Sequence, residues 1–453
     1  VAVIGGGPAG YVAAIKAAQL GGRAAVFEKS VLGGTCLNRG CIPTKCYLKT
    51  AELMEEIAGC AQRGIVLDAH PSVDLPKAVA HKNSVVKKLT DGVAGLLRSH
   101  KIDVYYGEAA LATETTLTCG GETYGFDSVL LCGGSKPGVI PIPGAESKNV
   151  LDSDALLDLE ALPRRLAIIG GGVIGCEFAS ILAAFGCKIT VVEMLPHLLG
   201  GMDRSLADAV ARQFTDAGIQ VELGARVKSV CDQGMEQAVV FEKNGAEGTV
   251  SAEYVLVSTG RKANSAGLGC EELGIRMERG FIQVDSHMRT SVPGIYAAGD
   301  ITGQGMLAHT ASEGGVVAVE NMAGIDRELR LNAVPKVVFV DKEVASVGMT
   351  REEAERAGMD VVTGTFSLAG NGKSLAMGKN QGFVTVVADR EHHAILGLHM
   401  MGPCASELVA LGTQMIASEL LLEDVECAIY PHPAVAEAIR EACLDALGRV
   451  VHA

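Results

Sequence analysis

Val-Ala-Val-Ile-Gly-Gly-Gly-Pro-Ala-Gly, residues 1–10, decides the fold of the first part of the chain. The four apolar residues predict a strand, and the glycines predict a tight turn into the alanine-rich helix that follows. The next apolar segment, 24–27, ends at Glu28. The first two glycines of such a turn admit a pyrophosphate, and the third lets helix and strand pack closely. We therefore assign Gly5, Gly7 and Gly10 to the pyrophosphate of a dinucleotide and Glu28 to its ribose.

The same pattern recurs 165 positions later, from residue 5 to residue 170. Residues 166–169 are apolar, residues 170–175 read Gly-Gly-Gly-Val-Ile-Gly, and the following strand ends in an acid at position 193. The first glycine precedes that acid by 23 positions in both copies, from 5 to 28 and from 170 to 193. This shared spacing predicts two dinucleotide sites, and hence electron transfer between two dinucleotides. The residues assigned to the second site are Gly170, Gly172, Ile174, Gly175, Glu193, Val227 and Gly260.

The second site is expected to bind NAD. Glu193 ends its strand, and no arginine follows it in residues 194–197. A carboxylate at this position accepts a hydrogen bond from a free ribose 2′-hydroxyl and repels a 2′-phosphate, which disfavours NADP. The first site adjoins a pair of cysteines and is therefore expected to hold a flavin.

That cysteine pair lies in residues 33–45, Gly-Gly-Thr-Cys-Leu-Asn-Arg-Gly-Cys-Ile-Pro-Thr-Lys. Pro43 suits the first turn of a helix, so Cys36 and Cys41 are expected near a helix N-terminus, where the backbone favours a thiolate. We interpret the pair as a redox-active disulfide. The spacing alone leaves two alternatives: ordinary buried thiols, and a pairing of Cys41 with Cys46, which is also five positions away.

A distal histidine could supply the protons for such a disulfide. Dithiol–disulfide exchange needs a base to form the attacking thiolate and an acid to protonate the leaving one, and histidine suits both near neutral pH. His432 is followed by a proline and, five residues on, by Glu437, which could orient its ring. The alternatives are that His432 only marks the start of a helix, or that another histidine serves. The other candidates are His309, His399, His392 and His393.

Composition limits the class of protein. With 453 residues, 48% hydrophobic and 20% charged, the chain is an ordinary globular protein of about three domains. A net charge of −14 and the absence of Trp argue against nucleic acid and anionic membranes, and no apolar run approaches the ~20 residues of a membrane span. Thirteen scattered cysteines without metal-type spacing predict a cytoplasmic protein with mostly reduced thiols and no metal site. Val1 already lies in a strand, so we expect a trimmed N-terminus from which a targeting segment could have been lost.

Taken together, these motifs resemble those of the pyridine nucleotide–disulfide oxidoreductases, and within that family those of the dihydrolipoamide dehydrogenases. The resemblance covers essentially the whole chain. The segments that carry it are 33–45, 170–177, 259–261, 298–300, 306–309, 345–348, 397–399, 402–407 and 432–437.

The resemblance implies a role for each matched residue. Cys36 would exchange with the lipoyl disulfide, and Cys41 would be the inner thiol beside the flavin, where it forms a charge-transfer complex as thiolate. Lys45 and Glu177 would pair next to the flavin, where hydride passes to NAD. The remaining residues implied for FAD, besides Lys45, are Gly34, Thr35, Gly107, Gly134, Ser135, Asp300, Met306, Leu307, Ala308 and His309.

The same resemblance implies an activity and its partners. Protein-bound dihydrolipoamide would be oxidised and NAD⁺ reduced through the disulfide and FAD. The carrier would be the E2 lipoyl domain of a 2-oxo acid dehydrogenase complex or the glycine-cleavage H protein. His432, held by Glu437, would act on the disulfide of another subunit, which implies a homodimer. The alternatives are another NAD(P)H-dependent disulfide reductase of the family and a non-catalytic flavoprotein subunit.

The expected fold is α/β, with two Rossmann-like dinucleotide-binding domains and a C-terminal α+β dimerisation domain. From residue 335 onward no glycine loop appears; strands are predicted at 337–340, 383–388 and 395–399, and helices at 406–418 and 435–447. The expected limits are 1–145 for the first part of the FAD domain, 146–266 for the NAD domain, 267–334 for the central part of the FAD domain and 335–453 for dimerisation.

Some positions depart from the family pattern. Leu131-Cys132-Gly133-Gly134-Ser135 stands where Ala-Thr-Gly-Ser is usual, and Ala434 and Ala436 replace hydroxyl residues after the His-Pro pair. Arg39 replaces a common valine between the two cysteines. We hypothesise that the charge of Arg39 stabilises a nearby thiolate.

Overall fold

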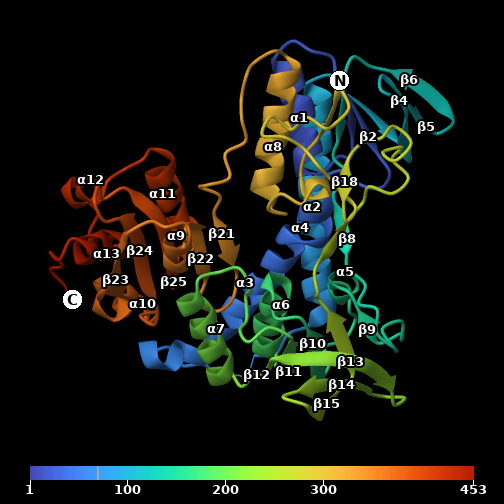
Figure 1. Cartoon of the computed structure of the whole chain (residues 1–453). Coiled ribbons are helices and arrows are strands. Elements are labelled where there is room, and N and C mark those ends of the chain that lie inside the picture. Colours follow the sequence, from blue (N-terminus) through green and yellow to red (C-terminus); the bar gives the residue numbers. More distant parts are fainter. Residues whose placement is uncertain (69–70, 453) are drawn as a thin grey trace.

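The first glycine loop follows the first strand of a parallel sheet, which is formed mainly by the N-terminal part of the chain (Figure 1). The computed structural model describes residues 1–68 and 71–452. Five strands lie side by side in the order β20-β7-β1-β2-β3, and all their pairings are parallel. These strands are β1 (Ala2–Ile4), β2 (Ala25–Glu28), β3 (Asp103–Tyr106), β7 (Val129–Leu131) and β20 (Ile295–Ala297).

The glycine turn has the geometry that its sequence predicts. Gly5 has a φ of +107°, a conformation that side chains disfavour, and it leads into helix α1 (Pro8–Gln19). A Cβ atom at Gly10 would lie 1.8 Å from the carbonyl oxygen of Gly5. Only glycine therefore lets α1 pack this closely against the end of β1.

The second glycine loop repeats this arrangement in a second parallel sheet, ordered β12-β11-β10-β16-β9. Gly170 has a φ of +109°, and a Cβ at Gly175 would lie 2.0 Å from its carbonyl oxygen. The elements are β9 (Val150–Leu151), β10 (Arg165–Ile169), α6 (Val173–Ala184), β11 (Lys188–Glu193), α7 (Arg204–Asp216), β12 (Gln220–Leu223) and β16 (Tyr254–Val257). The prediction of an α/β fold with duplicated dinucleotide-binding units is confirmed.

Each parallel sheet is covered by helices on one face and by a three-stranded antiparallel sheet on the other. The side chains of β1 alternate between α1 and α8 (Ala308–Met322) on one face and β4-β5-β6 on the other, while those of β10 alternate between α6 and α7 and the sheet β13-β14-β15. Burial on both faces explains why β1 and β10 are continuous apolar runs. The covering strands, which the sequence analysis did not predict, are β4 (Ala109–Thr113), β5 (Thr116–Cys119), β6 (Glu122–Gly125), β13 (Ala225–Asp232), β14 (Gln237–Lys243) and β15 (Ala246–Ala252).

The C-terminal part forms a separate antiparallel sheet flanked by helices, ordered β21-β22-β25-β24-β23. The three predicted strands and two predicted helices are present: β21 (Lys336–Val338), β24 (Phe383–Asp389), β25 (Ile395–Met401), α11 (Ala405–Ala417) and α13 (Glu437–Ala446). The sequence analysis did not predict β22 (Val344–Gly348), β23 (Val361–Ser367), or the short helices α9 (Arg351–Arg356), α10 (Gly372–Met377) and α12 (Leu422–Cys427).

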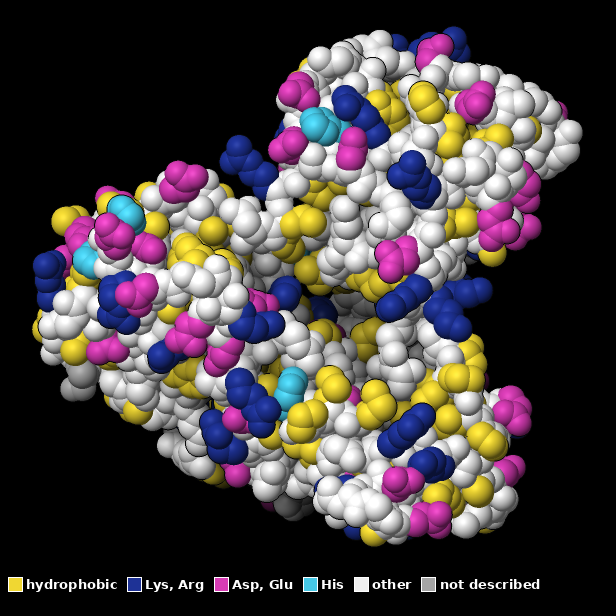
Figure 2. All heavy atoms as spheres, viewed as in Figure 1, with side chains coloured by type: hydrophobic (Ala, Val, Ile, Leu, Met, Phe, Trp, Pro, Cys, Tyr) yellow, Lys and Arg dark blue, Asp and Glu magenta, His cyan; other side chains and the backbone are white. Residues whose placement is uncertain are grey.

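Helices and short strands connect these units. The helices are α2 (Gly34–Arg39), α3 (Cys41–Gly59), α4 (Leu75–Ser99) and α5 (Ser153–Leu156); the short strand pairs are β8 (Ser135–Pro137) with β17 (Arg261–Ala263) and β18 (Met277–Glu278) with β19 (Phe281–Ile282). Figure 2 shows a hollow near the centre of this face, with Lys and Arg side chains at its edge. In residues 1–68 and 71–452 we find no helix with the length and apolar character of a membrane span.

Candidate active site

The cysteine motif is built on two consecutive helices that pack against the first glycine loop. Cys36 lies in α2, and Cys41 is the first residue of α3, with Pro43 in its first turn as predicted. The Gly33 N–H donates to the Gly6 carbonyl at 2.8 Å. A Cβ at Gly34 would lie only 2.7 Å from the backbone of the glycine loop. This close approach brings both cysteines to the edge of the first dinucleotide site.

The two thiols differ in acidity. A hydrogen bond from Cys36 lowers the pKa of the Cys41 thiol to about 7, burial opposes that shift, and the charge of Lys45 adds to it. The same hydrogen bond, together with burial, raises the pKa of Cys36. Burial also raises the pKa of Cys46. Cys36 and Cys41 are free thiols in the structure and lie in contact with each other, which favours the thiolate at the helix N-terminus; the disulfide between them stays a prediction.

An ion pair joins α3 to the helix of the second glycine loop. The Nζ atom of Lys45 lies 3.0 Å from both carboxylate oxygens of Glu177 on α6. The N–H of Phe339, just after β21, also donates to Glu177 at 3.2 Å, and its ring centroid lies 4.0 Å from Nζ. Burial raises the pKa of Glu177, and Lys45 opposes that shift. Three segments distant in sequence thus meet at one buried carboxylate.

The first glycine loop fits the pyrophosphate of FAD. Gly7 caps α1, and no side chain caps that end of the helix, so first-turn N–H groups are open to an anion. The carboxylate of Glu28 accepts the N–H groups of Gly6 at 2.7 Å and Ser30 at 2.8 Å, which fixes its direction at the end of β2. Gly107 closes the same edge, because its N–H donates to the Glu28 carbonyl at 2.9 Å.

A polar network connects the cysteine motif with other residues assigned to FAD. The Ser135 hydroxyl donates to Asp300 at 2.5 Å and accepts from the Nε of Arg261 at 2.7 Å. Arg261 also contacts the Thr35 hydroxyl at 3.4 Å and lies 4.0 Å from Asp300. Gly134 directly precedes Ser135 of this network. Residues 306–309 lead into α8, and Met306 has a positive φ of +44°.

The second glycine loop repeats the carboxylate geometry of the first. Glu193 accepts the N–H groups of Gly171 at 2.6 Å and Leu195 at 2.7 Å. Gly172 caps α6 without a side-chain cap, so this helix end is equally open to a pyrophosphate. Of the other residues assigned to NAD, Ile174 is half-buried in the first turn of α6, Gly260 has a φ of +117°, and Val227 is a buried residue of β13.

His432 and Glu437 form a hydrogen-bonded pair at the start of α13. Nδ1 of His432 lies 2.9 Å from Glu437, whose other oxygen accepts the N–H of Ala434 at 2.8 Å. Burial by itself raises the pKa of Glu437, but the contacts with Ala434 and His432 outweigh it, so that the pKa is lowered. The His432 side chain is 79% exposed, so Nε2 is free for proton transfer. Figure 1 shows α13 on the outer side of the C-terminal part, away from α2.

The competing histidines have other partners. His399 is fully buried between the Ser346 hydroxyl at 2.7 Å and the Met349 carbonyl at 3.0 Å, as a satisfied core residue would be. His309 contacts the carbonyl of Pro335 at 3.0 Å, and burial lowers its pKa. His392 contacts Asp389 at 3.0 Å, and His393 contacts Glu423 at 2.6 Å.

The geometry directs Arg39 to a different partner from the one hypothesised. Its guanidinium lies 3.4 Å from Asp154 of α5. The charges that act on the two thiols are those of Lys45, Asp300 and Glu177. The side chain of Arg39 is 61% exposed, and its guanidinium forms an ion pair with Asp154.

Two residues of the site were missed in the sequence analysis. Arg261 carried a signal, because it ends the Thr-Gly-Arg segment that belongs to the family resemblance. Phe339 carried none, because the carboxylate that it contacts lies 162 positions away. A contact of this range appears only in the folded chain.

Comparisons with known proteins agree on the family. Residues 1–315 match the model of the pyridine nucleotide-disulphide oxidoreductases, and residues 334–443 match the dimerisation domain of the same family. The chain is 41% identical to the dihydrolipoyl dehydrogenase of Chlamydia muridarum over 99% of its length and 97% of that protein. It is 39% identical to the one of Geobacillus stearothermophilus, over 99% and 96%.

Solved structures give the same result. LpdA from Mycobacterium tuberculosis superposes with a TM-score of 0.90 at 28% identity, over 98% of both chains. The HOCl-induced flavoprotein disulfide reductase RclA from Escherichia coli superposes with a TM-score of 0.87 at 29% identity, again over 98% of both chains. This chain therefore belongs to the pyridine nucleotide–disulphide oxidoreductase family.

Proposed function

We propose that this protein is a dihydrolipoyl dehydrogenase, which oxidises dihydrolipoamide and reduces NAD⁺ with the help of FAD. The observation that carries this function is the ion pair between Lys45 and Glu177. It joins the helix that begins at Cys41 to the helix that begins at the second glycine loop. The disulfide, the FAD loop and the NAD loop therefore converge, as a relay between a dithiol and a nicotinamide requires.

The cysteines carry out the exchange with the substrate. One substrate thiolate attacks Sγ of Cys36 and breaks the disulfide, which releases Cys41 as a thiolate. The second substrate thiolate then attacks the mixed disulfide, forms lipoamide and releases Cys36, which takes up a proton. Two electrons have now passed from the substrate to the protein. The lowered pKa of Cys41 favours its departure, because a more acidic thiol is the better leaving group.

The remaining residues orient the cofactors and move the protons. Bound FAD supplies the two-electron carrier between the dithiol and NAD⁺. Glu28 and the open end of α1 would hold its ribose and pyrophosphate. Glu193 and the open end of α6 would do the same for NAD⁺, and the carboxylate would reject a 2′-phosphate. Lys45 donates to the buried Glu177 carboxylate where the two sites meet and opposes the rise of its pKa on burial.

His432 would serve the disulfide of a second copy of the chain. It is exposed, it is oriented by Glu437, and helix α13, which follows it in the chain, lies away from α2 (Figure 1). A homodimer in which each C-terminal part faces the other subunit's cysteines would bring acid–base group and disulfide together. We further propose that the substrate is a lipoyl group on a carrier protein, and that the enzyme works in the cytoplasm.

The test is an anaerobic assay of the purified flavoprotein with dihydrolipoamide and NAD⁺. We expect NADH formation, no comparable rate with NADP⁺, and loss of turnover in Cys36→Ser with the flavin spectrum retained. Cys46→Ser is the matched control, because this thiol directly follows Lys45 on the same helix, and it should keep full turnover. Inactivity with dihydrolipoamide, combined with reduction of glutathione disulfide by NADPH, would overturn the proposal.

A further inference from the structure

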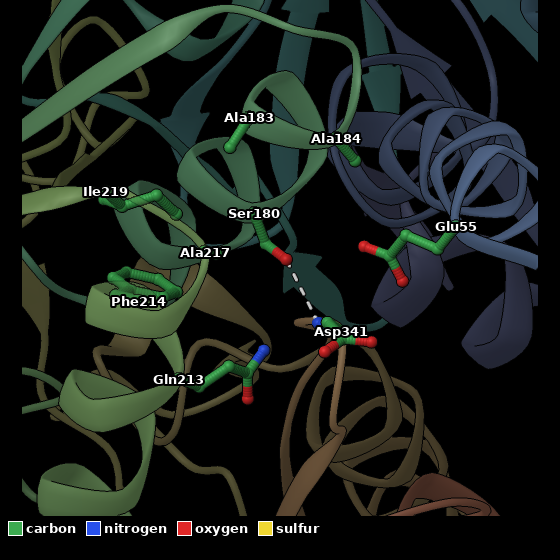
Figure 3. A pocket seen from close by; sticks show the side chains of 9 residues that line it. All are labelled: Glu55, Ser180, Ala183, Ala184, Gln213, Phe214, Ala217, Ile219 and Asp341. Carbon is green, nitrogen blue, oxygen red and sulfur yellow. Dashed lines mark hydrogen bonds between the residues drawn. The ribbon is translucent and has the colours of Figure 1, made fainter. Parts of the chain in front are cut away.

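Phe339 belongs to a short segment that crosses from the C-terminal sheet to the two dinucleotide-binding units. This segment, residues 339–341, follows β21 directly. Its N–H groups donate to two residues of α6: Phe339 to Glu177 at 3.2 Å and Asp341 to the Ser180 hydroxyl at 3.1 Å. Figure 3 shows the second of these bonds at the edge of a cavity. The segment is therefore fixed to α6 at both ends.

A cavity lies beside Asp341, the last residue of this segment. It has a volume of about 140 Å³ and lies between α3, α6, α7 and the segment. Glu55, Gln213 and Asp341 supply most of its polar lining (Figure 3). Only Asp341 of the segment lines this cavity; Phe339 packs against the hydrophobic cluster that includes α6.

Phe339 contacts both members of the Lys45–Glu177 pair. Its N–H donates to the carboxylate, and its ring centroid lies 4.0 Å from Nζ of Lys45, a distance typical of a cation–π interaction. The two contacts act in the same sense, because a donor favours a charged carboxylate and a ring face favours a charged ammonium. The hydrogen bond and the cation–π contact are both stronger where water is excluded, and Glu177 is only 7% exposed.

We propose that Phe339 is a positioning residue, whose ring holds the Lys45 ammonium in line with Glu177 and Cys41 at the junction of the two dinucleotide sites. The inference rests on the proposed function for its kinetic consequence. Its geometric basis is independent of the substrate. The ammonium has three N–H groups, and its two contacts to Glu177 leave it free to swing unless a third contact fixes it. The ring supplies that contact.

The test compares Phe339→Leu with Phe339→Tyr and with Phe383→Leu in the flavin-loaded protein. Leucine keeps the backbone N–H and removes the ring face, while tyrosine keeps the ring. Phe383 is the matched control, because it is also half-buried at the edge of the same hydrophobic cluster. We expect Phe339→Leu to slow flavin bleaching by NADH roughly 3- to 30-fold, the range of one cation–π contact, with KM for NADH within about twofold.

A second readout does not depend on turnover. Lys45 favours the Cys41 thiolate, so Phe339→Leu should move the pH midpoint of Cys41 alkylation upward, and Phe339→Tyr should restore it. Equal rates and midpoints in Phe339→Leu and Phe383→Leu would overturn the inference, since both variants remove the same mass from the same core. Failure to oxidise dihydrolipoamide would refute the proposed function, yet it would leave both of these measurements interpretable.

Discussion

The Nζ atom of Lys45 lies 3.0 Å from each carboxylate oxygen of Glu177, although 132 positions separate the two residues. Lys45 stands one helical turn after Cys41 on α3, and Glu177 stands in the second turn of α6. The pair is largely buried, with 29% of the lysine side chain and 9% of the glutamate side chain exposed. It is the point at which the chemistry of the cysteines meets the second dinucleotide site.

Loss of the lysine should therefore affect stability as well as turnover. Lys45→Met leaves Glu177 buried without its partner, which typically costs about 3 kcal/mol in the free energy of unfolding. Lys49→Met is the control on the same helix: its pair with Glu52 is 62% and 30% exposed, and such pairs contribute about 0–1 kcal/mol. Urea unfolding measures both variants. Equal losses would contradict the special role of the buried pair.

The acidity of Cys41 should depend on Cys36. In the reduced protein, we expect iodoacetamide to alkylate Cys41 with a midpoint near its pKa of about 7. Cys36→Ala removes the hydrogen bond that is the largest cause of this low value, so the midpoint should rise. Cys46→Ala should leave it unchanged. A midpoint in Cys36→Ala that stays near 7 would show that another group stabilises the thiolate.

Arg39→Val tests whether Arg39 acts on the thiols. Because the guanidinium faces Asp154, we expect the alkylation midpoint of Cys41 to stay where it is. The exposed ion pair should contribute no more than about 1 kcal/mol to the free energy of unfolding. A clear rise of the midpoint in this variant would restore the hypothesis that its charge stabilises a thiolate.

The proposed proton transfer between subunits predicts complementation. His432→Gln should lose at least the ~10²-fold typical of an acid–base group, and Cys36→Ser should be inactive. When the two inactive chains are unfolded and refolded together at equal amounts, half of the dimers are mixed, and each has one complete site. The mixture should then recover about a quarter of wild-type activity, as two-fold symmetry requires. No recovery would mean that His432 serves its own chain.

Glu55 should make stability depend on pH. Burial and the neighbouring Asp341 carboxylate raise the pKa of Glu55 to about 8. The folded protein thus holds a proton that the unfolded chain releases near pH 4.5, so stability contributed by this group falls as pH rises from about 4.5 to 8. Glu55→Gln should flatten that part of the Tm–pH profile, and Glu52→Gln should not. Identical slopes for both variants would contradict the raised pKa of Glu55.

Local sequence determined the two dinucleotide-binding units and the cysteine motif. Gly10 and Gly175 are required by close backbone contacts within one strand–turn–helix unit, and Gly5 and Gly170 have a positive φ there, so their spacing alone predicts the turn. Continuous apolar runs revealed β1 and β10, since both faces of each sheet are buried. The antiparallel covering sheets escaped prediction because their stability comes from packing on those faces and from neighbouring strands.

Only the tertiary structure decided how the site is assembled. Spacing left Cys41 with two equally distant partners, and in the folded chain the thiol of Cys36 contacts it, because α2 packs against the start of α3. Phe339 reaches Glu177 from another part of the chain, and Arg39 turns to Asp154 instead of the thiols. The physical reason is range: hydrogen bonds within a turn depend on neighbouring residues, whereas a buried ion pair depends on which distant helices the core brings together.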